Sequence, residues 1–232
     1  MNLVQTTFAV IAIIFATTLA KADHTPTKVS VNFGKIYAPG GFDDNDNVQI
    51  VGEGLFSDSC YRYAETSVRV DHKTKTIKVR PVAYKYPGYC LQVILPFDRV
   101  LDVGILQKGT YTVVQESDSQ HLGQVDILAT KNKEPDDFMY APISQAFFQS
   151  GGLSLMGDFP TSCMKLKEVK AQVQSDVLVI QPIVEIDSSI PCVEGKYHFE
   201  TVTDVSDVKP GRYLLHVRSM NGKAVNSLVD VQ

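Results

Sequence analysis

The sequence predicts an all-β protein made of two tandem, disulfide-stapled β-sandwiches that arose by internal duplication. Three observations carry this prediction: short runs that alternate with period two, a series of residues that recurs about one hundred positions later, and four cysteines that this repeat divides into two pairs. The 232 residues carry a formal net charge of −4, with 44% hydrophobic and 21% charged residues. This composition excludes wholesale disorder, and the near balance of charges argues against nucleic acid as a partner.

Residues 1–22 are predicted to form a signal peptide. A mostly apolar run from Phe8 to Ala20 is too short to span a bilayer comfortably, and Ala20-Lys21-Ala22 follows it as a small-residue cleavage pattern. The alternative is an uncleaved anchor helix. We expect a mature chain that begins at Asp23, has no transmembrane segment, and is secreted or periplasmic.

The repeat is visible as ordered matches. Three kinds of match share an offset of 103 residues: Tyr37-Ala38-Pro39 with Tyr140-Ala141-Pro142, Gly54 and Phe56 with Gly157 and Phe159, and Ser59-Cys60 with Ser162-Cys163. Later matches share an offset of 102: Cys90 with Cys192, Asp102-Val103 with Asp204-Val205, and Gly109 and Tyr111 with Gly211 and Tyr213. An ordered series with small slips indicates duplication. We therefore expect copy 1 at residues 29–129 and copy 2 at residues 133–231, with the linker region from Thr130 to Asp137.

The duplication also predicts how the cysteines pair. An even number of cysteines in an exported chain favours disulfides, and four cysteines allow three pairings. Two copies, each with its own pair, favour Cys60–Cys90 and Cys163–Cys192. Zinc is the alternative, but the sequence has no C-x-x-C pair and no histidine near a cysteine at ligand spacing.

Each copy is predicted to consist of strands. In copy 1, residues 67–70 and 76–82 alternate around a polar turn, and in copy 2 residues 169–173 and 177–180 do the same. Thr110 to Val114 and Tyr213 to Val217 are further β-rich runs, each preceded by a glycine one or two positions earlier. Because no helical stretch of 10–12 residues is apparent, each copy is expected to be a sandwich.

The segments Leu106 to Val113 and Val208 to Leu215 resemble the L-x-P-G-x-Y-x-V approach to a late strand in immunoglobulin-like and fibronectin-type sandwiches. The cysteine pair with G-x-Y is also similar to modules of exported bacterial proteins that have no assigned activity. The resemblance implies an immunoglobulin-like fold in which the hydroxyls of Tyr111 and Tyr213 bond to the backbone upstream. It does not imply a function.

Catalytic and cofactor signals are weak throughout. The sequence has no G-x-S-x-G, no histidine pair at ligand spacing and no acid pair set by spacing, so no catalytic residue and no cofactor are predicted. His216 is expected at the surface or with a satisfied partner. The metal candidates are Asp43, Asp44 and Asp46, because dense oxygen ligands suit calcium, although the stretch departs from the EF-hand template. A solvated turn is the alternative.

The binding candidates are Tyr84, Lys85, Tyr86 and Tyr89, which surround a Pro-Gly turn just before Cys90. Tyrosine offers a large amphipathic contact area at low entropic cost. The counterpart in copy 2, residues 185–190, is neither aromatic nor basic. The alternative is that these tyrosines pack against one edge of the sandwich.

These observations predict an exported, non-catalytic binding or structural module that acts on a protein or an envelope polymer at the cell surface. Two alternatives stay open. One is a hydrolase whose site is assembled between the two copies. The other is a secretion-sorting unit in copy 2, because Tyr213 to Val231 resembles the G-x-Y-x-V region of sorting domains.

Overall fold

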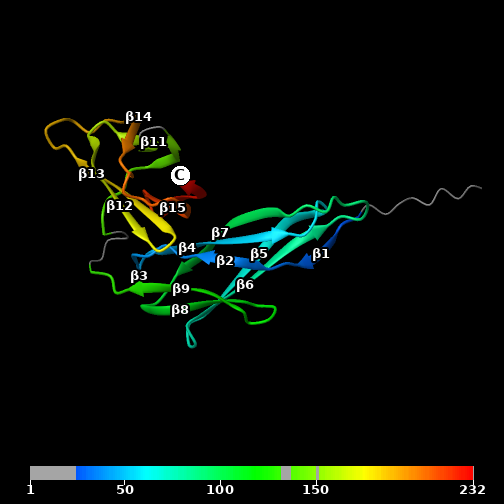
Figure 1. The fold of residues 1–232 in the computed structure, drawn as a ribbon. Coiled ribbons are helices and arrows are strands. Elements are labelled where there is room, and N and C mark those ends of the chain that lie inside the picture. The colour runs from blue at the N-terminus through cyan, green and yellow to red at the C-terminus, as the bar shows by residue number, and fades with distance from the viewer. Residues whose placement is uncertain (1–24, 132–136, 150–151, 232) are drawn as a thin grey trace, which may run out of the picture.

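The computed structural model describes residues 25–131, 137–149 and 152–231, and it confirms the all-β prediction (Figure 1). No helix long and apolar enough to cross a bilayer occurs in these residues, and the predicted signal peptide lies outside them. Copy 1 contains β1 (Thr27–Ser30), β2 (Phe33–Tyr37), β3 (Phe42–Asp43), β4 (Asn47–Phe56), β5 (Tyr61–Asp71), β6 (Thr76–Lys85), β7 (Leu95–Ile105), β8 (Gly109–Gln115) and β9 (His121–Leu128). Copy 2 contains β10 (Ile143–Gln149), β11 (Gly152–Thr161), β12 (Met164–Gln174), β13 (Val177–Ile186), β14 (Glu194–Thr203), β15 (Gly211–Ser219) and β16 (Lys223–Val231).

The two copies share one strand topology. In copy 1, one sheet has the order β2-β4-β7 and the other contains β5-β6-β8-β9, extended by the short β1 and β3; in copy 2 the sheets are β10-β11-β14 and β12-β13-β15-β16. In the larger sheet of each copy, an antiparallel hairpin is followed by a parallel pair and then by a second antiparallel pair. The parallel pair is β6 with β8 in copy 1 and β13 with β15 in copy 2. This correspondence supports the duplication. The parallel pair departs from the antiparallel sheets of immunoglobulin domains, so the strand pairing supports a β-sandwich but not that particular family.

Matched residues of the repeat hold each sandwich together. Phe56 stacks on Phe97 with ring centroids 4.3 Å apart, and Phe159 stacks on Phe199 at 4.1 Å. A Cβ on Gly54 would lie 2.5 Å from the Phe97 ring, and glycine at this position lets the ring approach the backbone. Gly157 leaves the same space for the Phe199 ring.

The predicted disulfides are confirmed. Cys60 and Cys90 are joined with their Cα atoms 5.4 Å apart, and Cys163 and Cys192 at 4.8 Å. Each bridge lies beside a matched serine whose hydroxyl accepts a hydrogen bond from the residue after the second cysteine. These bonds run from Leu91 N to Ser59 Oγ at 2.8 Å and from Val193 N to Ser162 Oγ at 3.0 Å. The Ser-Cys match therefore reflects a shared contact.

The match between the two Tyr-Ala-Pro segments is wrong as a structural equivalence. Tyr37 is the last residue of β2, whereas Tyr140 precedes β10 and forms a bridge opposite Ile183. The copy-1 residue in that place is Ser30, which lies opposite Val82 of β6. Pairing with a neighbouring strand, and not the identity of three residues, decides the backbone position here.

The expected tyrosine corner also differs from the prediction. Tyr111 is fully buried, but its hydroxyl lies 3.3 Å from Nδ1 of His72 in the β5–β6 turn, so its partner is a side chain and not the upstream backbone. The hydroxyl of Tyr111 therefore ties β8 to the β5–β6 hairpin.

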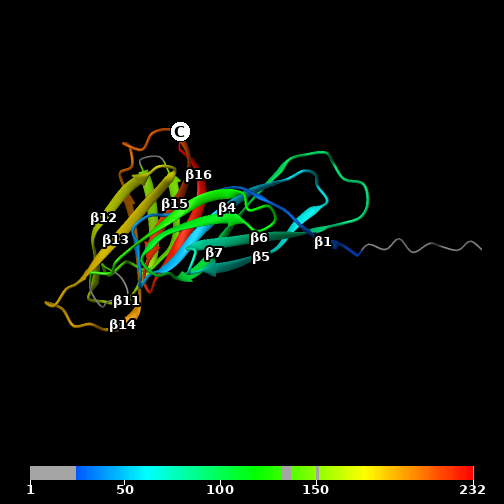
Figure 2. The same ribbon diagram turned by 90° about the horizontal axis from the view of Figure 1, so that it is seen from below.

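The two sandwiches stack on each other through a third apolar cluster. Tyr37 and Val51 of copy 1 pack against residues of β13 and β15 in copy 2, namely Val177, Val179 and Leu214. The sheet β2-β4-β7 therefore has one face in the core of copy 1 and its other face on copy 2. Strand β15 is buried on both faces for the same reason, which explains its uninterrupted run of buried residues. The result is four layers of sheet, with the far end of copy 1 pointing away from copy 2 (Figures 1 and 2).

Candidate functional site

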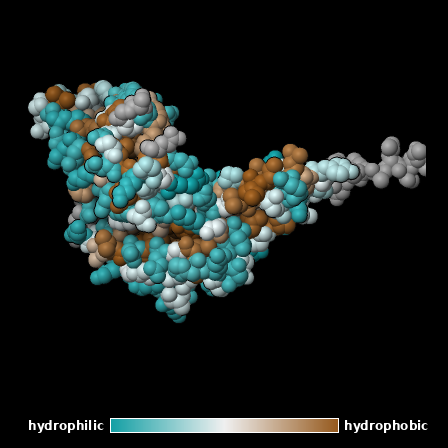
Figure 3. All heavy atoms as spheres, viewed as in Figure 1, coloured by the Kyte–Doolittle hydropathy of each residue, from teal (hydrophilic) through white to brown (hydrophobic). Residues whose placement is uncertain are grey.

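The candidate binding surface lies at the far end of copy 1. Strand β6 ends at Lys85, the chain turns through Pro87 and Gly88, where Gly88 has a φ of 128°, and β7 begins at Leu95. Large apolar side chains of this loop and of the adjacent end of β4 are solvent-exposed. We call them the tip: Leu55, Tyr86, Tyr89, Leu91, Val93 and Ile94. Hydrophobic residues gather at this end of the molecule in the space-filling view (Figure 3).

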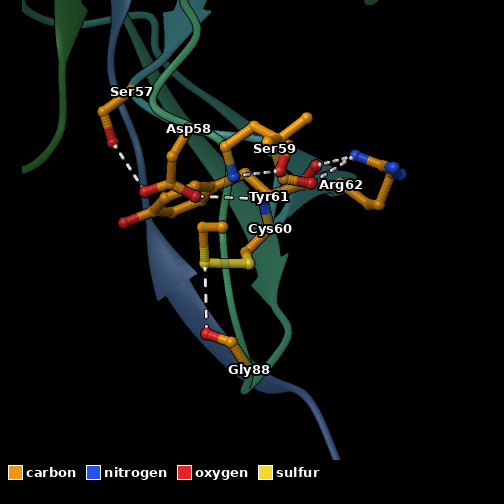
Figure 4. Close-up of a disulfide and its surroundings, with 9 residues drawn as sticks. Ser57, Asp58, Ser59, Cys60, Tyr61, Arg62 and Gly88 are labelled. Carbon is orange, nitrogen blue, oxygen red and sulfur yellow. Dashed lines mark hydrogen bonds between the residues drawn. A yellow bond between two sulfur atoms is a disulfide. The ribbon is translucent and has the colours of Figure 1, made fainter.

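The tip loop is held rigidly to the β4–β5 turn. Besides the Cys60–Cys90 disulfide, Tyr86 N donates a hydrogen bond to Cys60 O and Ser59 N donates one to Leu91 O, both at 3.0 Å. Asp58 accepts a further bond from Cys60 N at 2.9 Å. Figure 4 shows the bridge with Asp58, Ser59 and Arg62 around it. Because the loop is fixed before any contact, little conformational entropy is lost on binding.

Two cations lie at the edge of the tip. Arg62 donates from Nη1 to the carbonyl oxygens of Ser59 at 3.0 Å and Tyr61 at 2.7 Å. The Lys85 ammonium lies 5.2 Å from the centroid of the Tyr61 ring. Neither cation forms an ion pair with another described residue, so both charges face solvent. Arg62 also lines a shallow hollow with Tyr86 and Tyr89.

The sequence-predicted binding residues divide into two groups. Lys85, Tyr86 and Tyr89 are exposed on the loop, and Tyr89 is fully exposed at 108% of its reference area. Tyr84 lies within β6, half-buried, with Lys28 Nζ 5.8 Å from its ring centroid. Sequence reasoning missed the aliphatic part of the tip. The signal was the apolar run directly after Cys90, which has the composition of a strand.

The matching loop of copy 2 exposes different chemistry. Its exposed apolar side chains are Ile186, Ile190 and Val193, with no tyrosine. Its charges are mostly acidic and paired: Lys165 lies 3.3 Å from both Glu185 and Asp187. Hydrogen bonds from the Ser189 hydroxyl and backbone, together with Lys165, lower the pKa of Asp187 to about 2.

The acidic stretch takes part in contacts within the protein. Asp43 accepts a bond from Asn45 N, and Asp44 accepts one from Thr130 N. Asp46 is buried and forms an ion pair with Arg218 of copy 2 at 3.4 Å. Burial raises the pKa of Asp46, against the opposing effects of its bond from Asp43 N and of Arg218.

The described residues contain one close group of three potential metal ligands, Asp58 with Cys60 and Cys90, and its cysteines are already joined in the disulfide. Asp43, Asp44 and Asp46 do not converge in this way. Calcium binding by these three carboxylates therefore stays a prediction without support from the geometry.

The interface between the copies contains a buried polar pocket. His216 is 1% exposed, so of its two expected positions, at the surface or with a satisfied partner, the surface position is wrong. Its Nδ1 lies 2.7 Å from Asn226 Oδ1, while the Asn226 amide donates to Gln49 Oε1 at 3.0 Å, which orients that amide. We therefore assign the proton of neutral His216 to Nδ1, which leaves Nε2 as an acceptor without a partner among the described residues. Burial lowers the pKa of His216 to about 4; Arg218 adds to this effect and the Asn226 bond opposes it.

The cavity beside His216 is small. Its volume is about 20 Å³, and Asp46, His216 and Arg218 contribute to its lining. A cavity of this size accommodates about one water molecule, whereas small-molecule sites span hundreds of cubic ångströms. The carboxylate, the imidazole and the guanidinium thus meet between the two sandwiches, in a region that we call the joint.

The fold and its surfaces define a tandem β-sandwich protein with two disulfide-anchored loops. Residues 50–125, about a third of the chain, match the family model described as the ORF11 beta-sandwich domain. The match covers β4 to most of β9 and supports a β-sandwich module in copy 1. No curated protein and no solved structure matches the chain.

Proposed function

We propose that this protein is an exported, non-catalytic binding module that contacts its partner through the tip. The observation that carries the proposal is the exposure of five large apolar side chains on a loop that a disulfide and backbone hydrogen bonds hold in place, with Leu55 of β4 exposed beside them. Large exposed apolar patches on soluble domains mark interaction sites, and rigid loops bind at low entropic cost. Kinship with immunoglobulin-like or fibronectin-type modules of exported bacterial proteins remains part of this proposal.

Export to a secreted or periplasmic location is supported by two features. The apolar run and cleavage pattern of residues 1–22 have the form of a signal peptide. The two structural disulfides are typical of an oxidising compartment.

The two alternatives find less support in the geometry. The cavity beside His216, which residues of both copies line, has room for about one water and not for the substrate of a hydrolase. In a sorting unit, β15 and β16 would need to be accessible, but Leu214 and Leu228 pack against copy 1.

The test is retention of the chain from Asp23 onward, which contains every described residue, on an envelope fraction of the source cells. We expect the variant Tyr86→Ser/Tyr89→Ser/Leu91→Ser to lose at least about tenfold in retention, because hot-spot aromatic and apolar contacts carry most binding energy. The matched control is Ile186→Ser/Ile190→Ser/Val193→Ser in copy 2, which should bind as the unchanged protein does.

Both variants alter exposed side chains, so each should unfold within about 1–2 kcal/mol of the parent. Equal retention of the tip variant and its parent would refute the proposal. Unfolding of the tip variant alone would show that these side chains are part of the core, which would also refute it.

A further inference from the structure

We infer that the partner of the tip is a lipid surface that carries anionic headgroups. The inference rests on the proposed function and names the partner of the same surface. In this arrangement the apolar side chains of the tip enter the interfacial layer, and Arg62 and Lys85 lie at the level of the headgroups.

The shape of the tip fits a bilayer. Tyr89 is fully exposed and Leu91 and Ile94 are each 70% exposed, so these side chains project from the end of the sandwich. Next to them is an open hollow of about 300 Å³, which Ser59 and Arg62 help to line. Projecting aliphatic residues beside tyrosines suit an interface that is apolar below and polar above.

The charges at the tip favour anionic lipids over neutral ones. Arg62 and Lys85 are exposed and form no ion pairs with other described residues. The long side chain of Lys85 can extend its charge to headgroup level, whereas the Arg62 guanidinium is bonded to the carbonyl oxygens of Ser59 and Tyr61 at the base of the tip. In copy 2, the corresponding loop carries Glu185 and Asp187, both paired with Lys165. At the tip, one carboxylate, Asp58, lies beside the bridge, so the two cations leave a net positive charge there, whereas the copy-2 loop is net negative. An anionic surface therefore attracts one loop and not the other, although both expose apolar residues.

The path of the chain brings the tip to a membrane during export. Thr27 of β1 lies opposite Lys85, so the described chain begins beside the tip (Figures 1 and 2). The apolar run that ends at Ala20 is five residues before Thr25, a separation of at most about 17 Å. While a signal peptide occupies the membrane, the tip is the part of copy 1 tethered nearest to it.

The absence of tryptophan from the sequence permits a direct test. Tyr89→Trp places a single fluorescent reporter on the tip, and Ile190→Trp places one on the copy-2 loop as the matched control. Each chain, starting at Asp23, is mixed with vesicles of phosphatidylcholine alone or with one quarter phosphatidylglycerol.

We expect Tyr89→Trp emission to shift to the blue on the anionic vesicles and to be quenched by brominated acyl chains, with no change for Ile190→Trp. Adding Lys85→Gln to the Tyr89→Trp chain should weaken vesicle binding about threefold or more, and raising the salt concentration should weaken it further. Lys85→Gln should change the melting temperature little, because the exposed ammonium contacts the Tyr61 ring but forms no ion pair with another described residue.

The lipid inference would be overturned if Tyr89→Trp gave no shift on the anionic vesicles, or if both reporters gave equal shifts. The proposed function fails separately. If the triple tip variant still loses retention on envelopes while vesicles give no shift, the tip binds a protein or a polymer, and only the lipid inference is wrong.

Discussion

The two disulfide-anchored loops are built alike and present different surfaces. Each has a cystine, a serine that bonds to the residue after the second cysteine, and a stacked phenylalanine pair nearby. Copy 1 exposes tyrosines and aliphatic residues beside two unpaired cations, whereas copy 2 exposes isoleucine and valine among paired charges. Within these two loops, the shared residues fix the backbone, and the residues that differ face solvent. The two copies thus keep the same backbone framework at this loop and differ in the side chains that they expose.

The largest expected effects come from the disulfides. Cys60→Ser/Cys90→Ser and Cys163→Ser/Cys192→Ser should each lower the free energy of unfolding by about 3–4 kcal/mol, because each bridge closes a loop of about 30 residues. Denaturant unfolding of the two double variants measures this. If one bridge contributes several kcal/mol more than the other, the two loops are not built alike.

The next largest effect is a pH dependence of stability that comes from copy 2 and has no counterpart in copy 1. The folded state holds His216 neutral with a pKa of about 4, below its ordinary value of 6.5. As the pH falls, this histidine therefore takes up a proton in the unfolded chain before it does so in the folded protein. The free energy of unfolding that neutral His216 contributes above pH 6.5 falls by up to about 3 kcal/mol as the pH drops to 4. Asp46, whose pKa burial raises, opposes this at the acidic end.

The matching residue in copy 1 is Val114, which does not titrate. His216→Gln should therefore flatten the stability profile between pH 4 and 6.5 in urea titrations. A profile that keeps its slope in this variant would place the proton uptake elsewhere.

The matched glycines give a smaller and unequal effect. Gly54→Ala and Gly157→Ala should each destabilise the protein by about 1–3 kcal/mol through overpacking. Gly157→Ala should cost more, because its Cβ would meet the carbonyl oxygen of Pro142 more closely than a Cβ on Gly54 would meet that of Asn32, at 2.7 Å. The midpoints of thermal unfolding test the order, and a harmless Gly157→Ala would contradict the close approach described here.

The smallest effect concerns the serines. Ser59→Ala removes the hydrogen bond that Leu91 N donates, whereas Ser162→Ala removes two, one from Val193 N and one to the carbonyl oxygen of Pro191. Each lost bond should cost about 1 kcal/mol. Only Ser59→Ala should also weaken binding through the tip, by a few-fold, because it loosens the loop that carries Tyr89. Amide hydrogen exchange at Leu91 and Val193 reports the loosening directly, and equal loss of binding from both variants would contradict the assignment of binding to copy 1.

Much of the fold could be predicted because most residues that recur in the sequence make equivalent contacts in the two copies. Gly54 and Gly157, Phe56 and Phe159, and the two Ser-Cys pairs occupy equivalent places. The three-residue Tyr-Ala-Pro match failed because it lies where the copies begin differently, with strand β1 paired to β6 in one and a single bridge to β13 in the other.

The joint between the copies could not be predicted. It pairs Arg218 with Asp46 and Asn226 with Gln49, residues more than 170 positions apart in the sequence, and spacing gives no information on such contacts. The available signal was the lack of alternation in Leu214-Leu215-His216-Val217, which is typical of a strand buried on both faces. At the tip, the tyrosines were identified from composition, but Leu55 was not, because only the folded sheet brings it to that end.

Strand β4 also gives the molecule a mechanical property. Its outward-facing residues run from the joint to the tip: Gln49 bonds to Asn226, Val51 packs in the third apolar cluster, Glu53 pairs with Arg212, and Leu55 is exposed. A pull on the tip along this strand is resisted by hydrogen bonds to β2 and β7 that lie across the direction of force and are loaded together in shear. Copy 2 packs against the same strand, so a force on an attached tip would be transmitted to both sandwiches.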